Sequence, residues 1–332
     1  MKRSIIRQGH KTLTITLPSK WVNKLNLKPK DEIELIEKDN NLIITAYENL
    51  REKTATIDIR DFTIPILWRY FQSAYRSGCD EIKLIYDPDK KEYEDAFQYY
   101  TTHFDYSRLG EKIPKRTALH TIQSVVDRFL NIAIIRSGKG YCVIKEMGEP
   151  SMKEFENSLR RIFIIIFQMF DRIIEIVKED EIGNVRICKE IHTIDRNLDK
   201  FVDYCCRIIN KIETSFPDVK KNLLFSTLLI LELIGDEFKY IGKHLALTKK
   251  SLKDTLPILE RVKEHFEIYY KLFYKFDRNQ AINFGKNDKL VYEAYDEFKN
   301  KPGEGKSIVR HLMMMSKLSF ALIELRIEME FC

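Results

Sequence analysis

Hydrophobic and polar residues alternate with a period of two near the start of the chain, and periods typical of helices dominate from about residue 150 onward. Residues 12–17 alternate threonine with leucine or isoleucine, which is the pattern of a half-buried strand that ends at Pro18. Ser19 is a candidate N-cap for a short helix, and two further alternating runs around a polar turn predict a hairpin over 32–45. The chain is therefore predicted to begin with a small β-rich unit.

Strand and helix patterns alternate between about residues 50 and 148. The strand patterns fall at 54–59, 81–86, 132–136 and 141–145, and the helical ones at 65–76, 93–104 and 118–129. This alternation predicts a small α/β layer. Gly138 and Gly140 lie between two strands rather than before a helix, so they indicate a turn and not a phosphate-binding loop.

From residue 149 onward the chain has long helical periods with few glycines and prolines. The predicted helices span 151–178, 184–211, 222–245, 251–276, 288–300 and 306–330, with a break at 279–285. Six helices with short connections predict a bundle, and three plus three suggests an internal repeat. The predicted fold class is therefore multi-domain α+β, with domains at 1–48, 49–148 and 149–332.

Length and composition agree with this division. The chain has 332 residues, 44% of them hydrophobic, and a net charge of +6, so it can form real cores and is not a polycation as a whole. Its six cysteines include no C-x-x-C pair, which argues against a zinc ribbon or redox motif and favours buried thiols of an intracellular protein. With no signal-peptide pattern and no apolar run long enough to span a bilayer, we expect a cytoplasmic protein without membrane insertion.

Charge is sorted by sign within the first 46 residues. Eight cations and no acid precede Asp31, and five acids follow within 31–39. A field of one sign suits a phosphate backbone, which indicates DNA binding. The alternative interpretation is a small β-lobe with a charged face and no nucleic-acid partner. A unit this short has too little core to stand alone, which predicts a homodimer or a larger homo-oligomer. The predicted DNA contacts are Arg3, Arg7, Lys11 and Lys20.

The segment RQGHKTLTITLPSKWVNKLNLKPKDEIELIE, residues 7–37, resembles the AbrB/MazE/SpoVT swapped-hairpin DNA-binding family. It shares that family's basic strand, its strand ending in Leu-Pro, its short helix and the turn that precedes an acidic strand. Lys30 stands where the family usually has glycine. The resemblance implies an N-terminal swapped-hairpin β domain that binds double-stranded DNA as a dimer.

Two predicted helices carry carboxylates four residues apart, so that each pair shares a helix face. Asp195 and Asp199 lie on one helix, and Glu232 and Asp236 lie on the next. Four carboxylates on facing helices would repel one another without a cation, and their oxygens suit divalent or iron-type metal ions. His192 is a further candidate ligand. The alternative is a solvated face neutralised by Arg196, Lys200 or Lys239.

These carboxylates lie in recognisable motifs. Residues 231–236, LELIGD, resemble the signature of the PhoU family of phosphate-signalling regulators, and residues 195–199, DRNLD, resemble its companion motif. The resemblance covers about 150–330 and implies two three-helix bundles that bind metal clusters, with Glu324 and Glu328 in the matching place of the last helix. Independently of the resemblance, Gly235 inside a helix costs about 1 kcal/mol relative to alanine, which suggests close helix approach or room for a bound group.

The combination of the two resemblances is similar to an archaeal type of phosphate-uptake regulator. It implies a DNA-binding transcriptional regulator of phosphate uptake or homeostasis with a metal-binding sensor bundle. An alternative is an adaptor that does not bind DNA and regulates a phosphate transporter or signalling partner, and the basic first 30 residues argue against it. A carboxylate-bridged metal enzyme is disfavoured because the second, third and sixth predicted helices lack a Glu-x-x-His motif.

Overall fold

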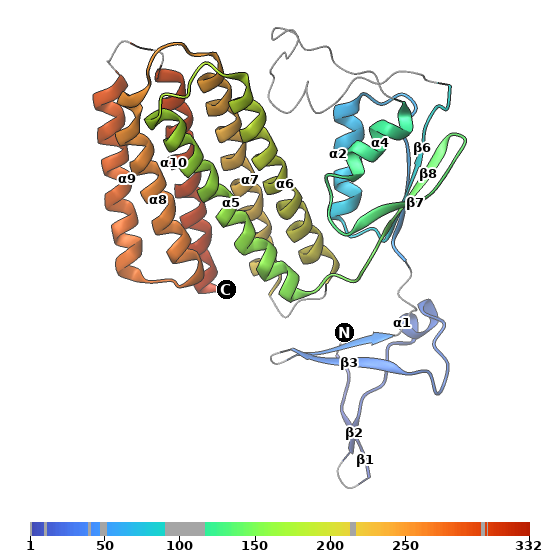
Figure 1. Cartoon of the computed structure of the whole chain (residues 1–332). Helices are drawn as coiled ribbons and strands as arrows, with labels where there is room; N and C mark the ends of the chain where they lie inside the picture. Colours follow the sequence, from blue (N-terminus) through green and yellow to red (C-terminus); the bar gives the residue numbers. More distant parts are fainter. Residues whose placement is uncertain are drawn as a thin grey trace. The chain divides into compact units, whose positions relative to one another are not determined.

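The computed structural model divides the chain into two compact units, Met1–Glu52 and Lys53–Cys332. Figure 1 shows the elements of each unit. No helix within the described ranges is long and apolar enough to cross a membrane. The residues that the structure describes are 2–9, 12–38, 41–46, 52–89, 117–212, 217–299, 303 and 305–332.

The first unit contains two separate antiparallel ladders and one short helix. Its described elements are β1 (Ile6–Gln8), β2 (Thr12–Thr14), α1 (Ser19–Lys24), β3 (Ile33–Lys38) and β4 (Asn41–Ala46). β1 pairs with β2, and β3 pairs with β4. The strand predicted over 12–17 is shorter in the structure, where β2 ends at Thr14. Its partner strand β1 begins at Ile6, which pairs with Thr14, so no backbone remains for residues 15–17 to pair with in this ladder. Ser19 is the first helical residue and not the N-cap, which is the extended Pro18.

The second unit begins with a four-stranded sheet and two helices, which we call the α/β layer. The strand order is β5-β6-β8-β7, with β5 and β6 parallel and the other neighbours antiparallel. Parallel neighbours need a crossover, and α2 supplies it, lying with α4 on one face of the sheet (Figure 1). The elements are β5 (Thr54–Asp58), α2 (Ile64–Arg76), β6 (Glu81–Ile85), α4 (Ala118–Val126), β7 (Ile132–Gly138) and β8 (Tyr141–Glu146).

The α/β layer agrees with the alternating patterns of the sequence. Pro65 lies in the first turn of α2, where a missing backbone N–H is tolerated, and Thr117 caps α4 by accepting a hydrogen bond from the His120 backbone N–H. The helix predicted at 93–104 lies outside the described residues.

A largely helical region follows the α/β layer. Ser151 and Glu154 form a capping box at its first helix, and Asn184 caps the second, as their side-chain oxygens allow. α5, α6 and α7 pack against one another, α8, α9 and α10 do the same, and α7–α10 and α5–α8 contacts join the two groups. The helices are α5 (Met152–Lys178), α6 (Val185–Lys211), α7 (Asp218–Leu247), α8 (Leu256–Tyr274), α9 (Arg278–Lys299) and α10 (Lys306–Glu328).

The break predicted at 279–285 is wrong, and so is the short helix predicted at 288–300. α9 already begins at Arg278, because Asp277 Oδ1 accepts a hydrogen bond from the Gln280 backbone N–H at 2.8 Å and starts the first turn. Phe284 then packs into the core with 1% of its surface exposed. Packing therefore overrides the low helix propensity of the asparagines and glycine in this stretch.

Candidate functional site

The structure aligns the predicted metal ligands on two helices that pack together, α6 and α7. Asp195 and Asp199 lie on α6, and Glu232 and Asp236 lie on α7. Asp203 continues the same row on α6, one turn beyond Asp199. Electrostatic interactions link neighbouring members of this set. We call these five carboxylates the acid face.

Lys239 neutralises one end of the acid face. Its Nζ lies 2.9 Å from Asp195 Oδ2, and it also pairs with Asp236. Burial disfavours its charged form, yet the surrounding carboxylates raise the pKa of Lys239 above its ordinary value, so it stays charged. Lys239 is one of the neutralising cations that the sequence offered as the alternative to a metal ion.

Arg76, the last residue of α2, reaches the acid face from the α/β layer. Its Nε lies 2.5 Å from Asp203 Oδ1, and its Nη2 lies 2.8 Å from Glu232 Oε2. Gln72, one turn earlier on α2, donates a hydrogen bond to the same Asp203 oxygen at 3.0 Å. One helix of the layer thus contacts carboxylates on both α6 and α7.

Arg128, just after α4, is the second arginine of the layer at the acid face. Its guanidinium carbon lies 3.9 Å from the centre of the Trp68 ring, a cation–π contact within the layer, and its Nη2 lies 3.5 Å from Asp199 Oδ2. Burial lowers the pKa of Arg128 to about 10, although Asp199 opposes that shift. Sequence reasoning missed both arginines, because their acidic partners lie 71 to 156 residues away in the chain.

In the ion pairs seen among the described residues, the carboxylates of the acid face outnumber their cations. Five carboxylates meet three paired cations, Lys239, Arg76 and Arg128. Burial raises the pKa of Asp199 and the pKa of Asp203 to about 6, against the opposing effect of these cations. Protons therefore supply part of the neutralisation.

The chemistry of the acid face suits a hard divalent cation, but its arrangement does not. No group of His, Cys, Asp or Glu side chains within the described ranges is placed to hold a metal ion. Arg76, Arg128 and Lys239 already pair with the carboxylates. Burial lowers the pKa of His192 to about 3, so its ring stays neutral and adds no charge to the acid face. Asp195 is fully buried, and its Oδ1 accepts no hydrogen bond from the described residues. In the arrangement seen here, the carboxylates are paired with cations of the chain, and no metal site is formed among the described residues.

Gly235 of α7 lies at a close contact with α6, next to Asp195 of the acid face. A Cβ built at Gly235 would collide with Leu198 Cδ2 and lie 3.0 Å from Asp195 Oδ1. Of the two roles that the sequence suggested for this glycine, the structure supports close helix approach.

Glu324 and Glu328 have a different environment from the acid face. Both are exposed on α10. Arg326, which lies between them in sequence, donates to the carbonyl oxygens of Leu272 and Phe273 at 3.0 and 3.1 Å. The two glutamates are therefore not brought into a buried carboxylate row.

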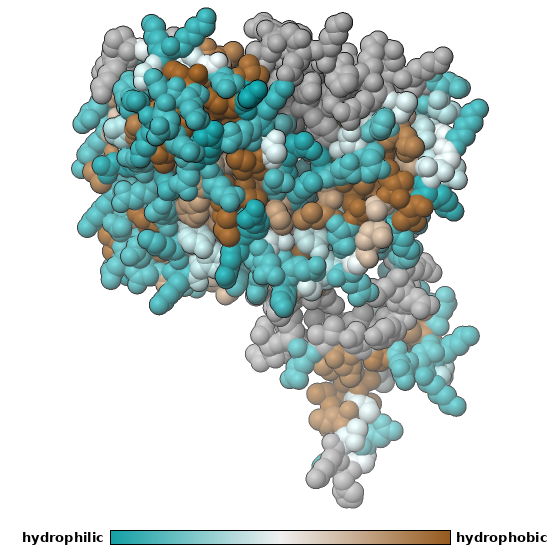
Figure 2. Space-filling view, in the orientation of Figure 1, coloured by the Kyte–Doolittle hydropathy of each residue, from teal (hydrophilic) through white to brown (hydrophobic). Residues whose placement is uncertain are grey.

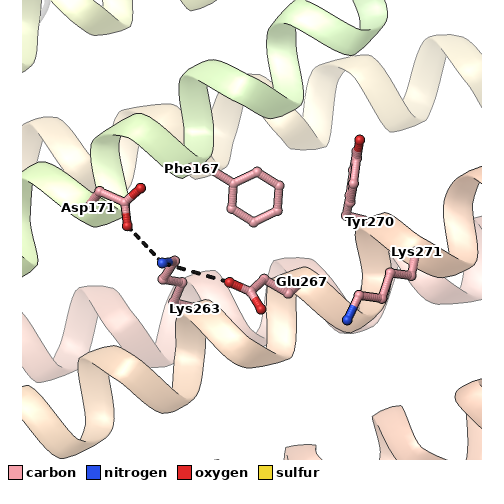
Figure 3. A pocket seen from close by; sticks show the side chains of 6 residues that line it. All are labelled: Phe167, Asp171, Lys263, Glu267, Tyr270 and Lys271. Carbon is pink, nitrogen blue, oxygen red and sulfur yellow. Dashed lines mark hydrogen bonds and ion pairs between the residues drawn. The ribbon is translucent and has the colours of Figure 1, made fainter.

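A hollow of about 320 Å³ lies between α5 and α8 (Figure 3). Lys263 Nζ lies 2.7 Å from Asp171 Oδ1 and 3.7 Å from Glu267 Oε1, so the charges at its rim are engaged in ion pairs with one another. None of the predicted site residues lines it, and we assign it no function. The hollow is lined by Phe167, Asp171, Lys263, Glu267, Tyr270 and Lys271.

In the first unit, three of the predicted DNA contacts are exposed. Arg3 precedes β1, Arg7 lies within β1, and Lys20 lies in the first turn of α1. Arg7 is paired with Leu13 of β2, so the two side chains lie on the same face of the ladder. Lys11 lies outside the described residues.

The turn before β3 shows how the chain accommodates Lys30. Its φ of 84° lies in the left-handed region, which glycine adopts easily and lysine rarely. Asp31 fixes the turn, because its Oδ2 accepts from the Lys28 backbone N–H at 2.7 Å and its own N–H donates to the Lys28 carbonyl at 3.0 Å. The turn keeps a positive φ although the glycine is missing.

Comparison with known families assigns this unit. Residues 6–51 match the family described as "Antidote-toxin recognition MazE, bacterial antitoxin". The N-terminal part of the chain is a MazE-type antitoxin domain. This confirms the resemblance found in residues 7–37. Neither the curated proteins nor the solved structures gave a match to the chain.

Among the residues of the MazE-type domain whose side chains are described, apolar side chains are open rather than packed into a core. None of the domain's residues whose side chains are described is buried, and Figure 2 shows hydrophobic residues on its surface. Large apolar side chains rarely stay this open in a small unit without a partner surface. The large apolar side chains with exposed fractions of 46–65% are Ile5, Ile6, Leu13, Ile15, Leu35 and Leu42.

Proposed function

We propose that the protein is a DNA-binding transcriptional regulator of phosphate uptake or homeostasis, and not an enzyme. The observation that carries the DNA-binding part is the charge of the first thirty residues of the chain, which include eight cations and no acid and overlap the MazE-type match at 6–51. Arg3, Arg7 and Lys20 are exposed, as contacts to DNA phosphates or base edges require. A duplex attracts such a field because each strand carries a regular row of phosphates.

A homodimer, or a larger homo-oligomer, is part of the proposal. The open apolar side chains of the MazE-type domain supply the reason, because a second copy of the same surface would remove them from water. Two copies would also double the number of cations that face the duplex.

The helical region is proposed as the sensor. Its assignment to phosphate rests on the resemblance of the LELIGD and DRNLD segments to the PhoU family. In this proposal Asp195, Asp199, Glu232 and Asp236 bind divalent or iron-type ions, and a phosphate transporter or signalling protein is the partner. Carboxylate oxygens favour such ions, and the bound ion would neutralise the excess negative charge of the acid face.

Binding of a fluorescent duplex to the full-length protein over a salt series tests the DNA-binding part. If about six phosphates are contacted per dimer, log K should fall against log salt with a slope of roughly −5. Replacing Arg3 and Lys20 with glutamine should weaken binding about tenfold and make the slope shallower by roughly 1 for each phosphate that is no longer neutralised. The matched control replaces Lys249 and Lys250, which are exposed lysines of the second unit.

The control pair should bind the duplex like wild type. Affinity that does not depend on salt, or equally weakened binding in both pairs of variants, would contradict the proposal. The second candidate is an adaptor whose helical region binds the partner protein, while the open apolar surface of the MazE-type domain serves only to dimerise the chain. If the duplex is never bound, while a partner protein is retained with or without residues 1–52, the adaptor function holds instead.

A further inference from the structure

Another hollow, of about 330 Å³, lies where the end of α7 meets the start of α10. His244, in the last turn of α7, lines it together with Lys306 and Ser307 of α10. No acidic side chain lines it within the part of the chain that the structure describes. We call this space the basic hollow.

The basic hollow differs in charge from the hollow between α5 and α8. In the latter, Lys263 is paired with two carboxylates. In the basic hollow, Lys306 forms no ion pair with a described residue. An ammonium, a hydroxyl and an imidazole all offer hydrogen-bond donors, and such donors beside an unpaired positive charge suit an anion.

Side chains around His244 give the potential at the basic hollow the same sign. Burial lowers the pKa of His244 from its ordinary value. The positive potential of His311, Lys243 and Arg310 lowers this pKa further. The carboxylate of Glu237 is already engaged, because its Oε2 lies 2.6 Å from His311 Nδ1. The His244 ring is therefore a neutral donor in a positive surrounding.

We propose that the basic hollow binds a phosphate group, carried either by free phosphate or by a small phosphate ester. Lys306 supplies the opposite charge, and Ser307 and His244 donate hydrogen bonds to the oxygens of the group. Leu247 and Leu252 also line the hollow, and apolar walls with a few polar groups are typical of pockets for small molecules. The inference rests on the proposed function, because it names the effector of a regulator of phosphate uptake or homeostasis.

The basic hollow is separate from the acid face. His244 follows Asp236 by eight residues on α7, which places it about 12 Å further along the helix axis. Phosphate bound in the hollow is held by side chains of the protein alone and needs no metal ion. This difference allows the two sites to be tested independently.

Calorimetric titration of the full-length protein in buffer with a chelator tests the hollow, because phosphate bridged by a metal ion at the acid face then cannot contribute. Inorganic phosphate and glycerol 3-phosphate are titrated separately, and the tighter of the two identifies which source of the phosphate group the hollow prefers. Lys306→Gln should weaken binding of that ligand about tenfold, because a charge-assisted hydrogen bond is lost. Lys306→Arg keeps the charge and should remain close to wild type.

Ser307→Asp is the sharper variant, because it places a carboxylate inside the hollow. It should abolish binding of both ligands, while an acidic side chain in the first turn of a helix is favourable for folding. Lys317→Gln is the matched control, since Lys317 is exposed on the same helix about three turns further along. It should bind like wild type, and circular dichroism should show equal helix content in all variants.

Three outcomes overturn the basic hollow. They are the absence of binding in wild type, equal affinity of wild type and the Lys306→Gln and Ser307→Asp variants, and binding that appears only when Mn²⁺ replaces the chelator. The last of these places phosphate at the acid face and supports the proposed sensor. If the hollow binds phosphate but the protein never binds a duplex, the proposed regulator fails and the hollow stands.

Discussion

At the scale of single residues, Gly235 allows a close contact between α6 and α7. An added Cβ would collide with Leu198 and lie 3.0 Å from Asp195 Oδ1, and both side chains are fully buried. We therefore expect Gly235→Ala to lower the free energy of unfolding by about 2 kcal/mol, as overpacking of a core typically does. Urea unfolding followed by circular dichroism measures the change.

Gly285 is the matched control for this prediction. It also lies inside a helix, α9, but a Cβ there would meet nothing within 4 Å. Gly285→Ala should raise the free energy of unfolding by about 0.5–1 kcal/mol, because alanine restricts the unfolded chain more than glycine does. A stabilising Gly235→Ala would show that the two helices can move apart freely at this point.

At the scale of elements, the sequence predicted those helices and strands whose position is determined by the local pattern of residues. The strands of the α/β layer and most of the helices were predicted within a few residues, because periodicity and caps such as Ser151 and Asn184 are local signals. The start of α9 was missed because asparagine and glycine are weak helix formers, and the packing of Phe284 is not a local signal. The row of acids was predicted, whereas Arg76 and Arg128 were not, because only the tertiary fold brings them to it.

The α2–α6 contact at Asp203 should make stability depend on pH. Burial raises the pKa of Asp203 to about 6 from 3.8, against the opposing effect of Arg76, so the folded state holds a proton that the unfolded state releases. The stabilisation that this proton gives the folded state is therefore complete below pH 3.8, and it is lost as the pH rises through about 6. Asp203→Asn removes this titration.

Urea unfolding of wild type and Asp203→Asn, in buffer with a chelator, checks the sign. Between about pH 5 and about pH 7.5, the stability of wild type should fall by about 1.4 kcal/mol relative to the variant. Asp58→Asn is the control, because the Arg60 hydrogen bonds lower the pKa of Asp58 and its carboxylate stays ionised in both states over this range. A difference between wild type and Asp203→Asn that does not change with pH would contradict the raised pKa.

At the scale of the whole molecule, the two units differ in how they bury apolar surface. The second unit has an extensive core that includes Phe163, Phe170, Phe238 and Phe266. The MazE-type domain has no buried residue among those described, although its strands carry large apolar side chains. An isolated domain of this kind buries too little surface to be stable, so we expect it to fold only as part of an oligomer.

Leu35 of β3, with 57% of its surface exposed, is the residue at which we expect the assembly to be sensitive. In the proposed dimer, an aspartate at this position would bury a charge in the shared core, which costs more than the contact can supply. Wild type should therefore have at least twice the 39.5 kDa mass of one chain, whereas Leu35→Asp should have a smaller mass in light scattering and bind the duplex more weakly. Leu247→Asp is the matched control, because Leu247 is 54% exposed at the end of α7, and it should leave the mass unchanged. An unchanged mass for Leu35→Asp would mean that the exposed apolar side chains of the MazE-type domain do not form the dimer core.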